Sequence, residues 1–318
     1  MSTINARTVA PYSVKGSLKK KLWNSKTLIL MCLPAIIYFI AFSYMPLPGI
    51  YVAFVNYNYR QGIFGSPFVG LKNFDFVAKS GKLWTLTTNT ILFNLAFIVL
   101  DNLLAVIVAI LLKEIQSKAF RKVSQTMMFL PYFISQVLVG LLVFSLLNSD
   151  TGFLNVVLQK FGMEKLRLYK TGDPWPLIII LVHLWQKTGY NSVVYFAAIM
   201  GIDDSIIEAS MIDGANGWQK IRHIILPSLR PTIVILLLFA LGGIVKGDFG
   251  LFWNLVGRNP ILYNKVDIIE MYVYRATVSD FNFSTASAVG LYQSLIGFVL
   301  VITVNAIVKK IEPDYSLF

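Results

Sequence analysis

Long runs of apolar residues constrain this chain more than any other feature of its sequence. A helix needs about 20 apolar residues to cross the hydrocarbon core of a bilayer, where its backbone groups must be hydrogen-bonded internally. Of the 318 residues 56% are hydrophobic and only 14% are charged, whereas about a quarter are charged in a soluble domain. The sequence therefore predicts an all-α, polytopic membrane protein. Its six spans are predicted at about 27–45, 90–112, 126–147, 177–200, 233–245 and 284–308.

Basic residues between the spans indicate how the chain crosses the membrane. Residues 1–26 carry six basic residues and no acidic one, so we expect this segment to stay in the cytoplasm. Altogether 15 basic residues lie in short segments on the predicted cytoplasmic side, against 11 in longer external loops. Both termini are therefore predicted to be cytoplasmic. A single transmembrane domain, 27–310, is followed by a C-terminal tail, 311–318.

Several other classes of function find no support in the sequence. The net charge of +12 does not indicate nucleic-acid binding, because the basic residues are spread among short loops beside apolar spans. Cys32 is the one cysteine, which excludes an intrachain disulfide and a cysteine-based metal cluster. There is no glycine-rich phosphate loop and no zinc-binding His-Glu-x-x-His motif, and His183 and His223 make a poor metal pair. We expect this chain to bind no cofactor or metal and to be no enzyme.

A polar stretch between the fourth and fifth spans, 202–231, is too hydrophilic to lie in lipid. Ser205 and Glu208 have the spacing of a capping box, which predicts the start of a short helix. Gly214 can adopt the left-handed conformation that ends such a helix, and Pro227 can start or kink the next span. The stretch is thus predicted to be a compact exposed knob that fits a partner's groove. Taken singly, Glu208 and Gly214 are explained as well by an ordinary helix start and helix end.

The joint spacing in this stretch resembles the cytoplasmic EAA loop of ABC importer permeases. The residues that carry the resemblance are Glu208, Ala209, Ser210, Gly214, Ile224, Leu226 and Pro227. Ser210 stands where many members of the family have a second alanine, and serine is small enough to preserve close docking. Residues 259–275 and 288–291 are also similar to the LplB-type subgroup of carbohydrate permeases, which resembles the maltose-importer permease.

The resemblance implies a permease subunit of a binding-protein-dependent importer for oligosaccharides or complex-carbohydrate fragments, in a bacterial cytoplasmic membrane. Its partners would be a second permease subunit, two copies of a cytosolic ATPase that bind ATP and Mg²⁺, an extracellular solute-binding lipoprotein and membrane lipids. The helix from Ser205 to Asp213 would be a coupling helix seated in the ATPase. The residues assigned to ATPase coupling are Ser205, Glu208, Ala209, Ser210, Met211, Asp213, Gly214, Leu226 and Pro227.

Polar and aromatic side chains in the fourth and sixth spans are candidates for lining a solute pathway. Tryptophan and tyrosine faces suit stacking on sugar rings, but the same residues also serve for packing and as interface anchors. In a heterodimer either permease subunit can carry the solute site. The candidates are Trp185, Gln186, Tyr190, Asn191, Tyr292 and Gln293.

Ionisable residues within the spans have no assigned role. Such groups are rare at this depth unless they face a bundle interior or a cavity. For Asp101 we favour structural pairing with a neighbouring helix, whereas His183 and Lys187 either line a cavity or reach the interface from a helix end. The short fifth span stops at Lys246-Gly247-Asp248, which indicates either a site at membrane depth or an ordinary helix end.

Two other functions compete with the importer. A secondary transporter driven by an ion gradient would use Asp101, Lys187 and Asp248 as proton or ion sites, and it would have an inverted internal repeat, of which the sequence offers no persuasive sign. A membrane-embedded enzyme would need convergent nucleophile, base or metal residues, whereas those of this chain are scattered. We therefore favour the importer.

Overall fold

A computed structural model describes residues 25–311 of the chain. The basic N-terminal segment up to residue 24 and the tail 312–318 lie outside the described residues. Within residues 25–311 the elements are helices, and the extended pairings are two isolated bridges. The predicted all-α class is confirmed. The chain divides into two units, residues up to Ile50 and residues from Tyr51 onward.

The first unit is an apolar helix. α2 (Lys26–Phe39) accommodates Pro34 and continues directly into the π-helical turn η1 (Ile40–Tyr44). Apolar residues occupy every side of α2, which suits a helix in contact with lipid. The 3-10 helix η2 (Leu47–Phe54) then begins in this unit and ends in the second.

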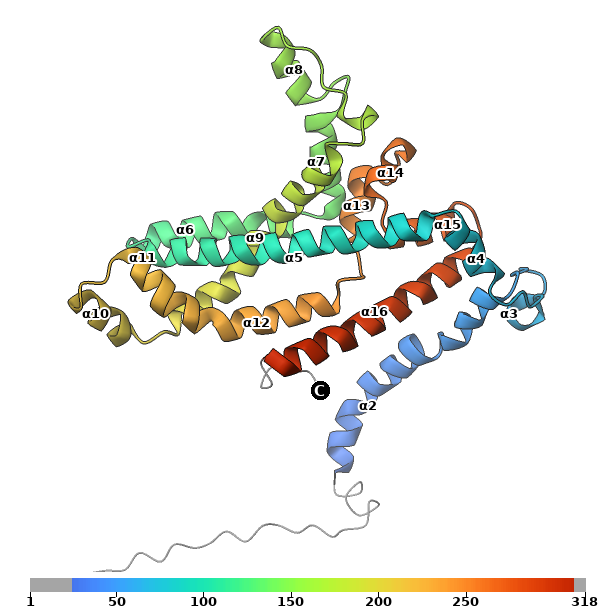
Figure 1. Cartoon of the computed structure of the whole chain (residues 1–318), viewed down its shortest axis with the longest axis horizontal. Coiled ribbons are helices and arrows are strands. Elements are labelled where there is room, and N and C mark those ends of the chain that lie inside the picture. The colour runs from blue at the N-terminus through green and yellow to red at the C-terminus, as the bar shows by residue number, and fades with distance from the viewer. Residues whose placement is uncertain (1–24, 312–318) are drawn as a thin grey trace, which may run out of the picture. The chain divides into compact units, whose positions relative to one another are not determined.

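The second unit consists of long helices joined by short ones (Figure 1). Its elements are α3 (Gly62–Gly65), α4 (Lys72–Lys79), α5 (Lys82–Glu114), α6 (Lys118–Phe129), η3 (Leu130–Phe133), α7 (Gln136–Leu147), α8 (Phe153–Lys160), η4 (Leu168–Lys170), α9 (Trp175–Met200), α10 (Asp204–Ile212), α11 (Gly217–Lys220), η5 (Ile221–Ile225), α12 (Leu226–Gly242), α13 (Phe249–Val256), η6 (Pro260–Leu262), α14 (Tyr263–Val266), α15 (Ile269–Val278) and α16 (Phe283–Ile311).

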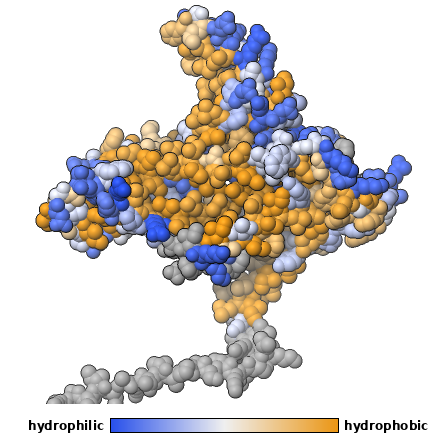
Figure 2. Space-filling view, viewed as in Figure 1, coloured by the Kyte–Doolittle hydropathy of each residue, from blue (hydrophilic) through white to orange (hydrophobic). Residues whose placement is uncertain are grey.

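The pair of α5 and α9 forms the centre of the second unit (Figure 1). One side of α5 is buried, whereas the other side exposes apolar residues at helical spacing, as a helix in lipid does. The exposed stripe consists of Leu92, Leu95, Val99, Leu103, Ile107 and Leu111. Figure 2 shows apolar residues along the long helices and hydrophilic residues gathered at the α10–α11 end.

Four helical segments among the described residues are long and apolar enough to cross a membrane. They are Lys26–Phe54, Lys82–Glu114, Gly217–Gly242 and Phe283–Lys310. A fifth arises if the bent pair Lys118–Phe133 and Gln136–Leu147 counts as one span. α9 stands at the predicted fourth span, but His183, Gln186 and Lys187 make it less apolar. The total of six spans stays a prediction.

Two of the predicted spans differ from the observed helices. The third, 126–147, is not one straight helix, because the chain bends by 95° between η3 and α7. Pro131 lies in the 3-10 turn, and Ser135 then caps α7 by accepting the N–H of Leu138. The fifth, 233–245, starts much earlier, because α11, η5 and α12 form one helical run from Gly217. Pro227 has no N–H to donate within this run, and the π-helical turn Ile221–Ile225 directly precedes α12.

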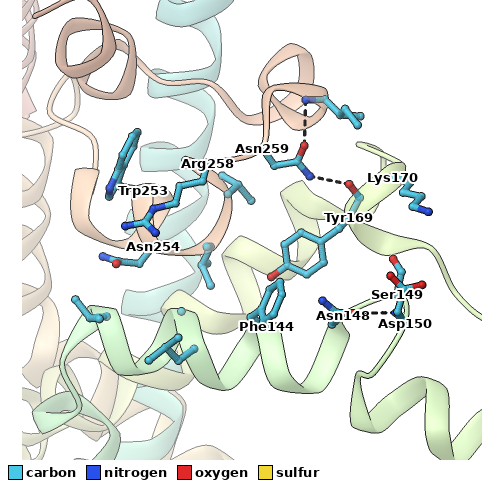
Figure 3. A pocket seen from close by; sticks show the side chains of 17 residues that line it. Phe144, Asn148, Ser149, Asp150, Tyr169, Lys170, Trp253, Asn254, Arg258 and Asn259 are labelled. Atoms are coloured by element: carbon cyan, nitrogen blue, oxygen red, sulfur yellow. Dashed lines mark hydrogen bonds between the residues drawn. The ribbon is translucent and has the colours of Figure 1, made fainter. Parts of the chain in front are cut away.

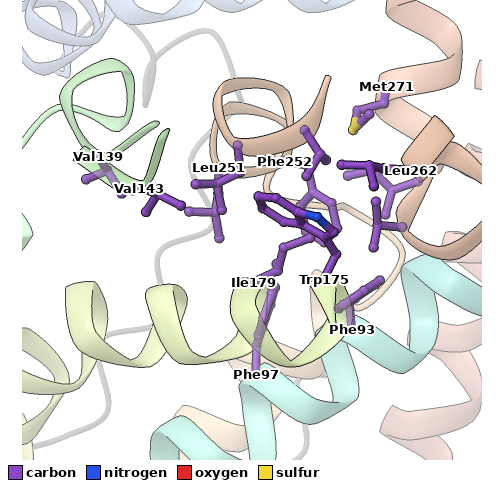
Figure 4. Packing of buried hydrophobic residues seen from close by; sticks show 14 residues of the cluster. Phe93, Phe97, Val139, Val143, Trp175, Ile179, Leu251, Phe252, Leu262 and Met271 are labelled. Atoms are coloured by element: carbon purple, nitrogen blue, oxygen red, sulfur yellow. The ribbon is translucent and has the colours of Figure 1, made fainter. Parts of the chain in front are cut away.

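A buried apolar cluster holds α5, α7, α9 and α13 together (Figure 4). Trp175 at the start of α9 is fully buried, and its Nε1–H donates to the carbonyl oxygen of Leu168 at 2.8 Å. Phe252 of α13 lies edge-on to Phe93 of α5, with ring centroids 4.9 Å apart. This packing fixes α13 and therefore the position of the segment between α12 and α13.

Candidate functional site

The loop that carries the predicted coupling residues begins with α10. Its N-cap is Asp203, whose carboxylate accepts the backbone N–H of Ser205 at 2.9 Å. This bond, and a further one from the Ser205 hydroxyl, hold the pKa of Asp203 below its usual range. The predicted capping box of Ser205 and Glu208 is wrong, because Asp203, as a charged acceptor, already satisfies the first free amide. Glu208 is exposed, and its carboxylate makes no hydrogen bond or ion pair within residues 25–311.

The end of α10 is formed as the sequence predicted. Gly214 has a φ of +77°, in the left-handed region. The N–H of Ala215 donates to the carbonyl oxygen of Ser210 at 2.9 Å, and that of Gly214 to Met211 at 3.1 Å. These two bonds make a Schellman motif, with Asp213 as the C-cap. A Cβ on Gly214 would meet nothing within 4 Å, so backbone conformation rather than space requires glycine here.

α11 follows with a capping box of its own. The Asn216 side chain accepts the N–H of Gln219 at 2.9 Å, and the Gln219 side chain accepts the N–H of Asn216 at 2.8 Å. Leu226 and Pro227, predicted as coupling residues, lie exposed at the start of α12 and thus on a different helix from the other members of that set.

The loop is fastened to the central helix pair. Lys220 Nζ lies 2.7 Å from a carboxylate oxygen of Glu114, and Lys113 Nζ lies 3.5 Å from Asp204. Lys113 and Glu114 both belong to the last turn of α5. The buried residues of the run that follows pack against α5 and α9, among them Leu229. The loop and the helical run after it are thus in contact with both α5 and α9.

α10, which lies outside the candidate spans, and the neighbouring α11 expose several apolar side chains. Ile206, Met211 and Ile212 expose 52%, 58% and 87% of their surfaces, and Trp218 exposes 66%. Ala209 is also exposed. Exposed apolar groups rimmed by charges are typical of surfaces that bind another protein or a membrane. α10 lies at one end of the long helices, whereas α4 and α15 lie at the other (Figure 1).

A second candidate site lies where two broken helices meet. Gln136, the first residue of α7, donates from Nε2 to Oδ1 of Asp248 at 2.8 Å. Asp248 is also the N-cap of α13 and accepts the N–H of Leu251. A Cβ on Gly250 would lie 1.6 Å from Oε1 of Gln136, so glycine here lets the bend of the third span reach α13.

Three more side chains hold the segment between α12 and α13. Asn94 of α5 donates to the carbonyl oxygens of Ile244 and Lys246, at 2.9 and 3.1 Å. Gln293 of α16 donates to the carbonyl oxygen of Val245 at 2.7 Å and to Glu270 of α15 at 2.6 Å. Glu270 accepts the N–H of Gly247 at 2.6 Å, while its other carboxylate oxygen is buried without a partner in the described chain. Irregular backbone in a membrane protein needs such protein partners.

The candidates for the solute pathway fall into separate groups. Gln186 is buried and donates to the carbonyl oxygen of Ile134 at the bend, at 2.9 Å. Tyr190 stacks on Tyr132 beside the same bend, with centroids 4.1 Å apart. Trp185 is 48% exposed on another side of α9.

The two candidates of the sixth span lie elsewhere. The hydroxyl of Tyr292 is 3.0 Å from that of Thr87 on α5, and Gln293 donates to the α12–α13 segment. The structure therefore does not bring all six candidates together.

Asp101 has the structural pairing that we favoured. It is 7% exposed, and its two carboxylate oxygens accept hydrogen bonds from Thr188 and Asn191 of α9, at 3.2 and 2.5 Å. His183 stacks on Phe97 of α5, with ring centroids 3.8 Å apart.

Lys187 lies elsewhere on α9, with its Nζ 5.0 Å from the Tyr132 ring centre. Thus Asp101 clamps α5 to α9, and Lys187 faces the bend of the third span.

Sequence reasoning missed Gln136, Glu270 and Tyr132. Gln136 is a strongly polar residue inside a predicted span, and Glu270 interrupts the apolar run after Asp267. Each is the kind of polar residue that is costly in a membrane without a partner. The sequence thus showed polar residues that need partners, but it did not show which residues those partners are.

Apolar helices suited to lipid, together with a capped exposed loop, define a membrane-embedded subunit that works with a partner outside the membrane. The chain belongs to the family of binding-protein-dependent transport system inner membrane components, whose pattern matches residues 101–316. It is thus a multi-pass transport permease of a cell membrane.

Three relatives show how far the likeness extends. YteP of Bacillus subtilis (strain 168), a polygalacturonan/rhamnogalacturonan transport system permease protein, is 34% identical over 92% of this chain and 91% of its own length. Protein LplB of the same organism is 27% identical over 99% of both chains. A crystal structure of a bacterial alginate ABC transporter, in complex with alginate pentasaccharide-bound periplasmic protein, has a matching chain with a TM-score of 0.82 and 31% identity, over 92% of this chain and 98% of that one. The predicted ABC permease resemblance is confirmed.

Proposed function

We propose that this chain is one of two permease subunits of an oligosaccharide importer and that it couples to a cytosolic ATPase through α10. The observation that carries the proposal is the form of this helix. Asp203 and Gly214 fix its two ends, and its apolar side chains are exposed. A surface held in one conformation loses little conformational entropy on binding, so it suits a groove in a partner.

Some of the coupling residues would contact the ATPase, and others would fix the conformation of the helix. Met211 and the exposed Ala209 offer apolar contact, Glu208 offers a free carboxylate for a charge-assisted hydrogen bond, and Ser205 and Asp213 stand at the ends of the helix. Ser210 is tied to its own helix, because its hydroxyl donates to the carbonyl oxygen of Ile207 at 2.7 Å. Leu226 and Pro227 would act from the neighbouring helix.

We infer the remaining partners from the family and the relatives. They are a second permease subunit, two ATPase copies that bind ATP and Mg²⁺, and an extracellular solute-binding lipoprotein, in a bacterial cytoplasmic membrane. Both termini and α10 would face the cytoplasm. The loops around α8 and α13 would then face outside.

Coupling requires that the ATPase states bind two conformations of the permease with different affinity. Movement of α10 would reach α5 through the Lys113–Asp204 pair. Through the short turn at Gly214 it would also reach the helical run that starts at Gly217, which the Lys220–Glu114 pair ties to α5. α12 ends at the segment held by Gln136 and Glu270. We propose that the contact between Gln136 and Asp248 opens when solute passes.

The solute class rests on the relatives and on the bend of the third span. YteP is named for polygalacturonan/rhamnogalacturonan transport, and the solved transporter is named for alginate. At the bend, Tyr132 and Tyr190 supply aromatic faces, and Gln186 has an amide oxygen that is buried without a partner in the described residues. Aromatic and amide groups together suit the apolar faces and hydroxyls of sugars.

Co-purification from native membranes tests the proposal. An ATPase and a second permease should accompany the wild type, whereas Ile212→Glu and Gly214→Trp should lose the ATPase and keep the second permease. Phe161→Glu, an exposed apolar residue after α8, is the matched control and should keep both. A wild-type chain that purifies alone and moves solute in liposomes without ATP would falsify the importer.

A further inference from the structure

A cavity of about 600 Å³ lies between α7 and α13 and is bordered by η4 (Figure 3). The two helices touch where a Cβ on Gly140 would lie 2.5 Å from the carbonyl oxygen of Asn254. Sites for small ligands have volumes of about 300–1,000 Å³. The cavity is separate from the α10 surface and from the Tyr132–Tyr190 pair, and none of the residues predicted for the solute pathway lines it.

Its walls combine aromatic rings with amides. Phe144 and Tyr169 lie together on one side, with centroids 5.5 Å apart, and Trp253 lies on the other (Figure 3). Burial raises the pKa of Tyr169 to about 12, so its hydroxyl remains a hydrogen-bond donor. Asn254 donates to the carbonyl oxygen of Gly250, which leaves its own side-chain oxygen able to accept.

Ser149 in the wall has an unmet hydrogen-bonding requirement. It is 6% exposed, and within the described chain its buried hydroxyl has no partner. A buried hydroxyl without a hydrogen bond is unfavourable, so such groups normally have a partner. The oxygen exposes less than 1 Å² of its surface, so it takes part in the inner wall and does not face a ligand in the cavity.

The charges at the cavity favour an anion. Arg258 and Lys170 line it, and neither forms an ion pair among the described residues. Asp150 is the one acidic residue of the lining. Arg258 lies beside Trp253 and Asn254 (Figure 3), and its planar guanidinium can hold a carboxylate through two parallel hydrogen bonds.

We propose that this cavity binds a uronic acid unit of the transported oligosaccharide, with Arg258 paired to the sugar carboxylate. The proposal rests on the proposed importer function and narrows its substrate class to acidic oligosaccharides. In the proposed topology the cavity faces outside, so it receives the sugar before the Gln136–Asp248 contact opens. An aromatic ring packs on the sugar, and the side-chain oxygen of Asn254 accepts from one of its hydroxyls.

The test measures binding of trigalacturonic acid and of its neutral methyl ester to the full chain in lipid nanodiscs, by calorimetry. Wild type should bind the acid more tightly than the ester. Arg258→Gln should weaken binding of the acid about tenfold or more and that of the ester less than twofold, because hydrogen bonds to a charged partner are the strong ones. Arg60→Gln, an exposed arginine outside the cavity, is the matched control and should change neither.

Three results would overturn the assignment: no saturable binding of the acid by wild type, equal binding of acid and ester, or an Arg258→Gln variant that binds like wild type. If Arg258→Gln instead loses the second permease on co-purification, the cavity is a subunit interface and the assignment also fails. Failure of the proposed importer function would give a different result, namely a wild-type chain that co-purifies without an ATPase. Trp253→Ala provides a second variant, and it should weaken binding of the acid and the ester alike.

Discussion

Gly214 shows how one residue can determine the form of a surface. Its positive φ closes the Schellman motif of α10, and open space surrounds it. Any side chain there is accommodated sterically but strains the backbone. The sequence alone predicted this conformation, because the preference of glycine for the left-handed region is a local property.

Gly214→Ala should destabilise the end of α10 by about 1–2 kcal/mol, the strain of an alanine in this conformation. Hydrogen exchange of the α10 amides should accelerate by about tenfold, as 1.4 kcal/mol corresponds to a factor of ten. Gly217→Ala is the matched control, since Gly217 also has nothing within 4 Å but lies in a helix without positive φ. Equal exchange in the two variants would contradict the prediction.

At the scale of elements, side chains from several helices form hydrogen bonds to the segment between α12 and α13. The sequence indicated a break at Lys246-Gly247-Asp248 and left open whether it was a site or a helix end. The structure has side chains from α5, α7, α15 and α16 around it. The break is therefore a junction of helices, and Glu270 lies at its centre.

Glu270→Ala should lower the free energy of unfolding by about 2 kcal/mol, because it leaves the N–H of Gly247 without its acceptor in a buried place. A lower thermal midpoint of the detergent-solubilised chain would record this loss, and Glu270→Gln should be intermediate because it keeps an acceptor. Glu164→Ala, at an exposed position in the loop after α8, is the control and should leave the midpoint unchanged. A midpoint for Glu270→Ala equal to that of wild type would refute the assigned role.

For the whole molecule, the arrangement of ionisable groups bears on what drives transport. An ion-driven carrier needs a site that can gain and lose its ion. Here both oxygens of Asp101 are bonded to α9, and Asp248 is bonded to Gln136 and caps α13. Lys187 lies over the Tyr132 ring. These contacts serve to hold helices together.

Liposomes that contain the assembled complex should accumulate trigalacturonate only when ATP is supplied on the ATPase side. A pH gradient without ATP should give no accumulation, since no group of this chain is assigned to proton transfer. Asp101→Asn should lower the stability of the complex without changing this dependence on ATP. Accumulation driven by the pH gradient alone, and lost in Asp101→Asn, would instead support the ion-gradient carrier.

The sequence by itself determined what depends on neighbours along the chain. Apolar runs gave the membrane class, and the spacing around Glu208 and Gly214 gave a short helix with a glycine end, because propensity and capping act within a few residues. Even there the choice between competing caps was missed, since Asp203 and Ser205 both offer an acceptor and their geometry decides which is used.

Only the tertiary structure decided which distant residues meet. Gln136 and Asp248 are 112 positions apart, and Gln293 is 48 positions from the carbonyl that it binds. The cavity beside Arg258 likewise needs α7 and α13 to touch at Gly140. Periodicity tells which side of a helix is polar, but the partner on that side depends on how helices pack, and packing is a property of the whole fold.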